Sequence, residues 1–354
     1  MSISLTVKHE QGLSKRIWMS VLFLVALSVF FLDIALGPVK IPLEKVIHVI
    51  LGMETDNYIH ANIIENIRIP KAITAILCGC ALSVAGLLMQ TLFRNPMAGP
   101  DVLGITSGAS LGVAMLMLAS GVGINMIKQV SWFHSWMIVM AASFGSAMVL
   151  LIVLGISIKI RNNATLLIIG IMIGTLTISV VSLLLFFSSP EQVQDYLAWT
   201  FGSIGGVTKK HLYILSLFVS IGLFLALLAS KSLNMLLLGE NYAQAMGLSL
   251  TKSRIIIIAA TSLLAGSITA FCGPIAFIGL AVPHLCRALF NTSDHALLIA
   301  ASCLTGSTIM LICDIIVHSA VSQTVLPINV VTAFVGAPVV IWVILTKGNI
   351  KKVY

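Results

Sequence analysis

An aspartate and a histidine stand four residues apart inside an apolar stretch near the end of the chain. Asp314 and His318 fall on one face of a helix, where side chains at this spacing interact. An ionisable group at membrane depth is costly unless it is paired or hydrated, so Asp314 is a candidate for a proton relay. One acid and one imidazole do not make a relay chain, and we favour a structural pair that anchors the helix or faces a partner.

Other residues that could support catalysis do not occur at catalytic spacings. The chain has no G-x-x-x-x-G-K-S/T motif and therefore no P-loop. Its six cysteines form no C-x-x-C pair and lie in or beside apolar stretches, which is typical of small buried side chains. No H-E-x-x-H motif occurs among the eight histidines. We expect no catalysis and no metal or cofactor bound by this chain.

The composition determines which elements position these residues. Of the 354 residues, 58% are hydrophobic and 9% are charged, and the mean hydropathy is +1.08. An ordinary soluble domain has about a quarter charged residues, so a soluble enzyme is excluded. Disorder is also excluded, because it requires low hydrophobicity and high charge. The chain is predicted to be a polytopic membrane protein.

Ten nearly uncharged stretches are candidates to cross the bilayer, which requires about 20 apolar residues per helix. One uncharged run is too long for a single helix and contains Gly273-Pro274, so two shorter passes are predicted there. We predict an all-α fold in one permease domain, 1–354, embedded from 17 to 346. The candidate spans are 17–36, 72–93, 102–120, 133–155, 164–187, 211–230, 255–273, 274–290, 296–317 and 328–346.

The basic residues predict the orientation, because Lys and Arg accumulate in cytoplasmic loops. With the N-terminus inside, 13 of the 20 basic residues are cytoplasmic, which places both termini in the cytoplasm. We interpret Lys15-Arg16 and the following apolar run as an uncleaved first span. The net charge of +8 is then a topology signal and does not indicate a nucleic-acid partner.

Two segments indicate helix packing and partner docking. Gly104, Gly108 and Gly112 recur every fourth residue, a spacing that allows two helices in lipid to approach closely. The polar segment 238–248 has glycines near both ends and is too short to span the membrane. It is either a simple connection or a docking element for a cytoplasmic partner, and composition leaves both open.

Taken in order, several segments resemble the FecCD-type permeases of ABC importers for vitamin B12, haem and iron–siderophore complexes. The resemblance covers nearly the whole chain from about residue 17, and the segment 273–284 is highly specific. The matching segments are RIPK at 68–71, GLLMQ at 86–90, RNPMA at 94–98, LGITSG at 103–108, LGE at 238–240, GPIAFIGLAVPH at 273–284 and LPINVVTAFVGAP at 326–338.

The resemblance implies ten helices per subunit, in a bacterial cytoplasmic (inner) membrane. It implies a dimer, expected to be a homodimer although some relatives pair two different subunits, with the translocation path at the interface. Two ATPase subunits would bind on the cytoplasmic side and use the ATP, and a periplasmic or lipid-anchored binding protein would dock outside. The family's coupling loop falls on 234–250 and would transmit ATPase closure as a rigid shift. Its matching residues are Leu238, Gly239, Glu240, Ala243 and Gly247.

The outer docking positions depart from the family pattern, which usually has arginines that pair with acids of the binding protein. The corresponding residues are Arg68, Lys71 and His318. Lysine lacks the bidentate fork of arginine, and histidine titrates near neutral pH. We expect Arg68 and Lys71 to dock the binding protein, with His318 contributing when protonated. Gly99 follows the RNPMA segment at a position where family members usually have an acid. This replacement has no consequence that we can derive.

The expected function is the permease subunit of an ATP-driven importer for an iron–siderophore complex, or else for haem or cobalamin. The alternative is an ion-coupled secondary transporter using Asp314, although such carriers usually show internal repeats and several intramembrane charges. A purely structural membrane subunit is the third possibility. A wide path could be lined by small or weakly polar side chains, for which we expect Met89, Gln90, Ser107 and Ser110.

Overall fold

The computed structural model describes residues 2–37, 39, 41–51, 53, 58–118, 131–160, 162–319 and 326–346, and its regular elements in this part are all helical. The α-helices are α1 (Ser2–Ala35), α2 (Leu43–Ile50), α3 (Tyr58–Ile63), α4 (Ile69–Leu92), α5 (Ile105–Leu118), α7 (Ser131–Lys159), α8 (Asn163–Phe186), α9 (Pro190–Thr200), α10 (Lys209–Leu237), α11 (Glu240–Ala245), α12 (Leu250–Cys272), α13 (Ile278–Phe290), α14 (His295–Ser319) and α15 (Ile328–Thr346). A π-helical turn, η1 (Ile64–Arg68), leads into α4, and a 3₁₀ turn, η2 (Pro100–Leu103), precedes α5.

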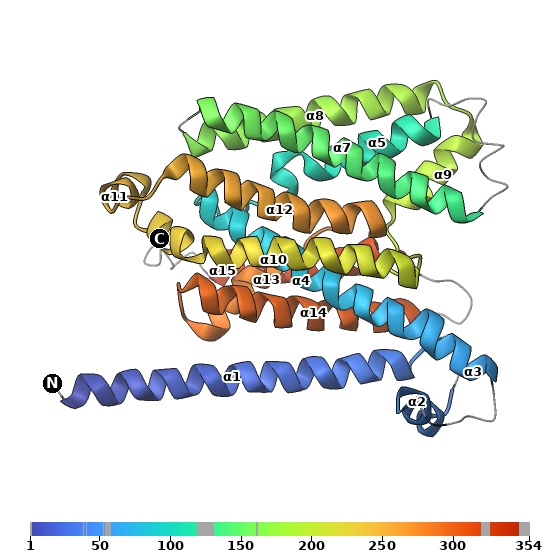
Figure 1. Ribbon diagram of the computed structural model, residues 1–354, viewed down its shortest axis with the longest axis horizontal. Helices are drawn as coiled ribbons and strands as arrows, with labels where there is room; N and C mark the ends of the chain where they lie inside the picture. The colour runs from blue at the N-terminus through green and yellow to red at the C-terminus, as the bar shows by residue number, and fades with distance from the viewer. Residues whose placement is uncertain are drawn as a thin grey trace.

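Each of the ten predicted passes corresponds to one helix, which confirms the all-helical membrane fold. Among the described residues, seven helical segments are long and apolar enough to cross a membrane, and α5, α13 and α15 are shorter apolar helices. The helices lie roughly parallel, and the start of α1 lies at the same end of the bundle as α11 (Figure 1). The opposite end carries α3 and α9 (Figure 1).

Helix α4 is the centre of the bundle, where it contacts α10, α12, α13 and α14. All its residues from Cys78 to Leu92 are buried. Glycines make this crowding possible. A Cβ on Gly86 would lie 1.8 Å from the carbonyl oxygen of Gly279 on α13, and one on Gly79 would lie 2.1 Å from that of Gly306 on α14. Small residues at such crossings let backbones pack in direct contact where lipid supplies no hydrophobic driving force.

The predicted break at Gly273-Pro274 is confirmed, because α12 ends at Cys272 and α13 begins at Ile278. Non-helical backbone at membrane depth requires partners within the protein. Here Ser203 N–H donates to the Cys272 carbonyl at 2.7 Å, and Ala276 N–H donates to Asn329 Oδ1 at 3.0 Å. The break is therefore stabilised by the segment after α9 and by the first turn of α15.

The glycine series at 104, 108 and 112 packs against two helices. Gly108 and Gly112 contact α7 at Gly145 and Ala141, as close packing predicts. Gly104 lies before α5, has a φ of +72° and contacts α8 near Gly170. Two members thus confirm the packing prediction on α5, while the third caps the preceding turn.

Candidate functional site

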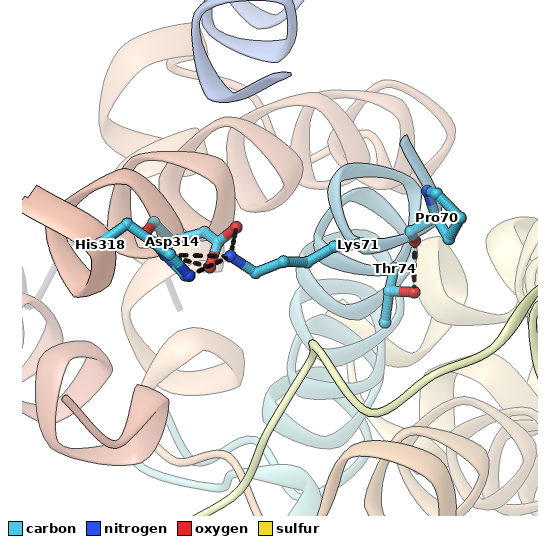
Figure 2. A network of polar contacts seen from close by, with 5 residues as sticks. All are labelled: Pro70, Lys71, Thr74, Asp314 and His318. Carbon is cyan, nitrogen blue, oxygen red and sulfur yellow. Dashed lines mark hydrogen bonds and ion pairs between the residues drawn. The ribbon is translucent and has the colours of Figure 1, made fainter. Parts of the chain in front are cut away.

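An ion pair lies inside the bundle near its α3 end. Lys71 Nζ on α4 is 2.8 Å from Asp314 Oδ2 on α14, and the two side chains are 14% and 1% exposed (Figure 2). Asp33 of α1 is also buried and lies near Asp314, so that the two carboxyl groups interact electrostatically. The sequence signal for Asp33 is its position in the last turn of the first predicted span.

His318 takes part in this cluster. Lys71 Nζ lies 2.8 Å from Nε2 and 2.9 Å from Nδ1, and Nδ1 lies 2.9 Å from the Asp314 carbonyl oxygen (Figure 2). The carbonyl can only accept and the ammonium can only donate, so the ring lies between an acceptor and a donor. The contact of Nδ1 with the Asp314 carbonyl confirms that Asp314 and His318 share one helix face.

Arg68 is directed into the protein. Its side chain is 7% exposed, and Nη1 donates to the carbonyls of Ile34 at 2.8 Å and Ala35 at 2.9 Å, while Nη2 donates to the Val39 carbonyl. It thereby satisfies carbonyls that the end of α1 leaves without helical partners. The structure thus engages the guanidinium internally, in a position that does not present it to a docking protein.

Lys71 and His318 do reach a cavity. Together with Asp314 they line a partly open space of about 190 Å³ that is also lined by the segment 201–205 and by 326–328. The Lys71 ammonium at the wall of this cavity is already paired with the Asp314 carboxylate. Of the three cations expected to dock a binding protein, two therefore share one cavity, and Arg68 supports the end of α1 instead.

At the other end of the bundle, the predicted coupling loop forms α11. Residues 234–237 belong to the last turn of α10, so the connection proper is shorter than the predicted 234–250. Gly239 and Gly247 flank α11 with φ values of +114° and +87°, a region that favours glycine. Ala243 is fully buried and fixes one side of the helix.

The exposed side of α11 and its two flanks carries apolar side chains among polar ones. Leu238 just before the helix, Tyr242 within it and Met246 directly after it are 64%, 66% and 44% exposed. Exposed apolar patches rimmed by polar residues typically mark interaction sites. Of the five predicted coupling residues, Leu238 contributes to this surface, while Gly239, Ala243 and Gly247 shape the helix. The sequence feature that could have identified Tyr242 and Met246 is the four-residue spacing of apolar residues at 238, 242 and 246.

Polar contacts attach α11 and the adjoining end of α10 to three other segments. Glu240 Oε1 lies 2.9 Å from Arg254 Nη2 on α12. Arg94, after α4, donates through Nη2 to the Leu237 carbonyl at 2.9 Å. Asn234 in the last turns of α10 donates to Asp294 Oδ1 at 2.9 Å, and this hydrogen bond is the main cause that lowers the pKa of the Asp294 carboxyl. A displacement of α11 and the end of α10 would therefore change contacts with α12, with the end of α4 and with the start of α14.

The exposed face of α8 carries a line of hydroxyl groups. Thr175, Ser179 and Ser182 are exposed, and each donates to a carbonyl of its own helix at 3.0 Å. Bonding within the helix lowers the cost of placing hydroxyls in an apolar environment. The buried side of α8 is narrow and consists of Leu166, Gly170, Gly174, Thr177 and Val181.

The residues expected to line the path lie elsewhere. Met89 and Gln90 are fully buried in α4, and Gln90 accepts a hydrogen bond from Arg287 at 2.6 Å. A residue enclosed within one subunit cannot line a path between two, so the structure does not support these two positions. Ser107 and Ser110 on α5 are partly buried, and Ser110 contacts Tyr196 of α9.

Comparisons with known proteins agree with this architecture. A model of the FecCD transport family matches residues 23–346. The vitamin B12 import system permease protein BtuC of Klebsiella pneumoniae subsp. pneumoniae is 32% identical over 98% of this chain and 98% of its own length. BtuC of Escherichia coli (strain K12) is 33% identical over 80% of this chain and 83% of its length. A solved structure described as an inward-facing conformation of a metal-chelate type ABC transporter aligns with a TM-score of 0.80 at 24% identity, covering 93% of this chain and 98% of its own.

Proposed function

Because the chain belongs to the FecCD transport family, whose members are permeases of ABC importers, we propose that it carries an iron–siderophore complex, haem or cobalamin into the cytoplasm. It is a multi-pass membrane transport subunit, and ATP is used by the ATPase partner. The observation that supports this function best is the exposed apolar face of α11, a short helix at the cytoplasmic end that is anchored on its other side. The named vitamin B12 permeases make cobalamin the first cargo to test.

The exposed face of α11 suits an ATPase subunit as its partner. Leu238, Tyr242 and Met246 offer apolar side chains, while Glu240 is turned inward to Arg254. Aromatic and methionine side chains are enriched at the centres of protein interfaces. Two copies of the permease would present two such helices, one for each ATPase subunit.

The cargo path is proposed to lie between two copies along α8. Its outward face has no charged residue and combines apolar side chains with the hydroxyls of Thr175, Ser179 and Ser182. A weakly polar surface of this kind allows a large chelate to pass without binding it tightly. The α5 residues Ser107 and Ser110 lie behind this face rather than on it.

A binding protein is proposed to dock at the α3 end, near the cavity that Lys71 and His318 line. Since Lys71 is paired with Asp314, its contribution to docking would require the partner's acid to compete with Asp314. Arg68 would act indirectly, by holding the end of α1 in place.

Reconstitution tests the function directly. The permease is co-expressed with its ATPase and placed in vesicles with the binding protein, and uptake of labelled cobalamin, haem and ferric siderophores is compared with and without ATP. We expect ATP-dependent uptake of one cargo class. Tyr242→Glu should prevent the ATPase from co-purifying, because it places a charge at the centre of the apolar face, whereas Tyr213→Glu at the opposite end of α10 should not. Uptake driven by a proton gradient without ATP would contradict the proposal.

The alternative of an ion-coupled carrier using Asp314 is not supported. Asp314 is 1% exposed and its carboxylate is paired with Lys71 of α4, a partner other than the His318 considered from the sequence.

A further inference from the structure

One buried guanidinium joins three segments at the cytoplasmic end of the bundle. Arg254 stands in the first turn of α12 and is 4% exposed. Its Nη2 lies 2.9 Å from Glu240 Oε1 on α11. Its Nη1 donates to the Ile160 carbonyl at 3.0 Å, in the short link between α7 and α8. A single side chain therefore contacts both the helix with the exposed docking face and the residue that directly follows α7, three residues before the helix with the hydroxyl line begins.

The chemistry of this group makes the connection stiff. A guanidinium is planar and holds its donors in a fixed fork, so the positions of its two acceptors are fixed relative to each other. The ammonium of a lysine has no such fork and sits at the end of a flexible chain. Arg254 thus relates the position of Glu240 to that of Ile160, which are 80 residues apart in sequence.

The start of α8 is also attached to the end of α4. Asn163 donates through Nδ2 to the Leu92 carbonyl at 2.7 Å, which ties α8 to the end of α4. Beyond this point only a narrow side of α8 packs against the subunit, largely through glycines that meet η2 and α5. A helix attached in this way can tilt when its first turn is displaced.

We infer that Arg254 is a positioning residue that transmits a displacement of α11 to the start of α8. This inference rests on the proposed function, since it assumes that an ATPase moves α11 and that cargo passes along α8. When α11 shifts, Glu240 displaces the Arg254 guanidinium through their ion pair. The guanidinium in turn displaces the Ile160 carbonyl, and with it the link between α7 and α8. The start of α8 then changes its distance from the second copy.

The first test measures how well ATP hydrolysis is coupled to transport. Wild type and Arg254→Lys are reconstituted with the ATPase and the binding protein, and the amount of cargo moved per ATP hydrolysed is determined. Lysine retains the charge for Glu240 and loses the simultaneous bond to Ile160, so the ratio should fall at least about fivefold, the lower end of typical coupling effects. Lys252→Gln is the matched control, because it removes an exposed cation two residues away on the same helix and should leave the ratio unchanged.

The second test follows the movement itself. Spin labels at Ala164→Cys, an exposed position in the first turn of α8, report the distance between the two copies with and without ATP. The distance should change in wild type and change much less with Arg254→Lys. If Arg254→Lys does not assemble, Glu240→Gln replaces it, because this variant weakens the link at α11 and leaves the bond to Ile160.

The outcomes separate the inference from the proposed function. A wild-type complex that moves no cargo with ATP would refute the proposed function. A working wild type with an Arg254→Lys variant that transports the same amount per ATP would refute the inference alone. Equal loss of hydrolysis and transport, with label distances that still respond to ATP, would also refute it, since Arg254 would then serve stability or docking.

Discussion

The ammonium group of Lys71 balances a carboxylate that the surrounding helices remove from solvent. Removing one member of a buried ion pair leaves an uncompensated charge and costs more than removing both. The His318 ring lies within hydrogen-bond distance of the same ammonium, so Lys71 is the centre of the cluster. Asp33 adds a second acid beside it.

We predict that Asp314→Asn destabilises the subunit by about 3 kcal/mol, the lower end for breaking a buried pair, because Lys71 loses its partner. The double variant Lys71→Met/Asp314→Leu should recover most of this loss, since apolar residues of similar volume replace buried pairs at little cost. Unfolding by denaturant in mild detergent measures both. If Asp314→Asn were as stable as wild type, the ion pair of Lys71 with Asp314 would not contribute to stability.

Close helix crossings hold the centre of the bundle. At the contact of α4 with α13, Gly86 leaves no space for even a methyl group. Protein interiors deform little, so added volume at a backbone contact forces the helices apart.

Gly86→Ala should therefore lower the unfolding free energy by about 3 kcal/mol, the upper range for overpacking. Gly155→Ala in α7 is the matched control, because nothing lies within 4 Å of its added Cβ. In a helix interior that change should be neutral or stabilise by about 0.5–1 kcal/mol. Thermal unfolding of the two variants in the same detergent compares them directly, and equal midpoints would contradict the packing argument.

The sequence predicted the helices well and the contacts between them poorly. Ten passes and the break at Gly273 follow from local hydropathy and from glycine and proline, which act within a few residues. The burial of Gln90 depends on which helix becomes central, and the inward turn of Arg68 depends on where α1 ends. The contact of Arg254 with Ile160 joins positions 94 residues apart. No local pattern specifies such pairs.

A single subunit leaves a large apolar surface uncovered by protein. On α8 this surface includes hydroxyl groups, and on α15 Phe334 and Ile341 are 77% and 56% exposed beside a groove of about 560 Å³. The side chains on α15 suit lipid or another subunit, and the hydroxyls of α8 make that face weakly polar. These faces agree with assembly of two copies.

Assembly along α8 predicts the result of crosslinking. Ser179→Cys subunits treated in membranes with a short bifunctional thiol reagent should form covalent dimers, because the hydroxyl lines of two copies would face each other. Ser220→Cys, an exposed position on α10, should remain monomeric, and wild type controls for the six native cysteines. Dimers from Ser220→Cys and none from Ser179→Cys would place the interface on another face.

The contact between Ala276 and Asn329 has a consequence for how the chain is made. Residues 273–277 enter the bilayer during synthesis more than fifty residues before Asn329 is translated, yet the amide of Ala276 depends on that side chain for its acceptor. Until α15 arrives, this amide must be satisfied by water or by the insertion machinery. The last helix therefore completes the interior of the nascent protein, and a chain truncated before it would carry an unfinished membrane segment that quality-control proteases can recognise.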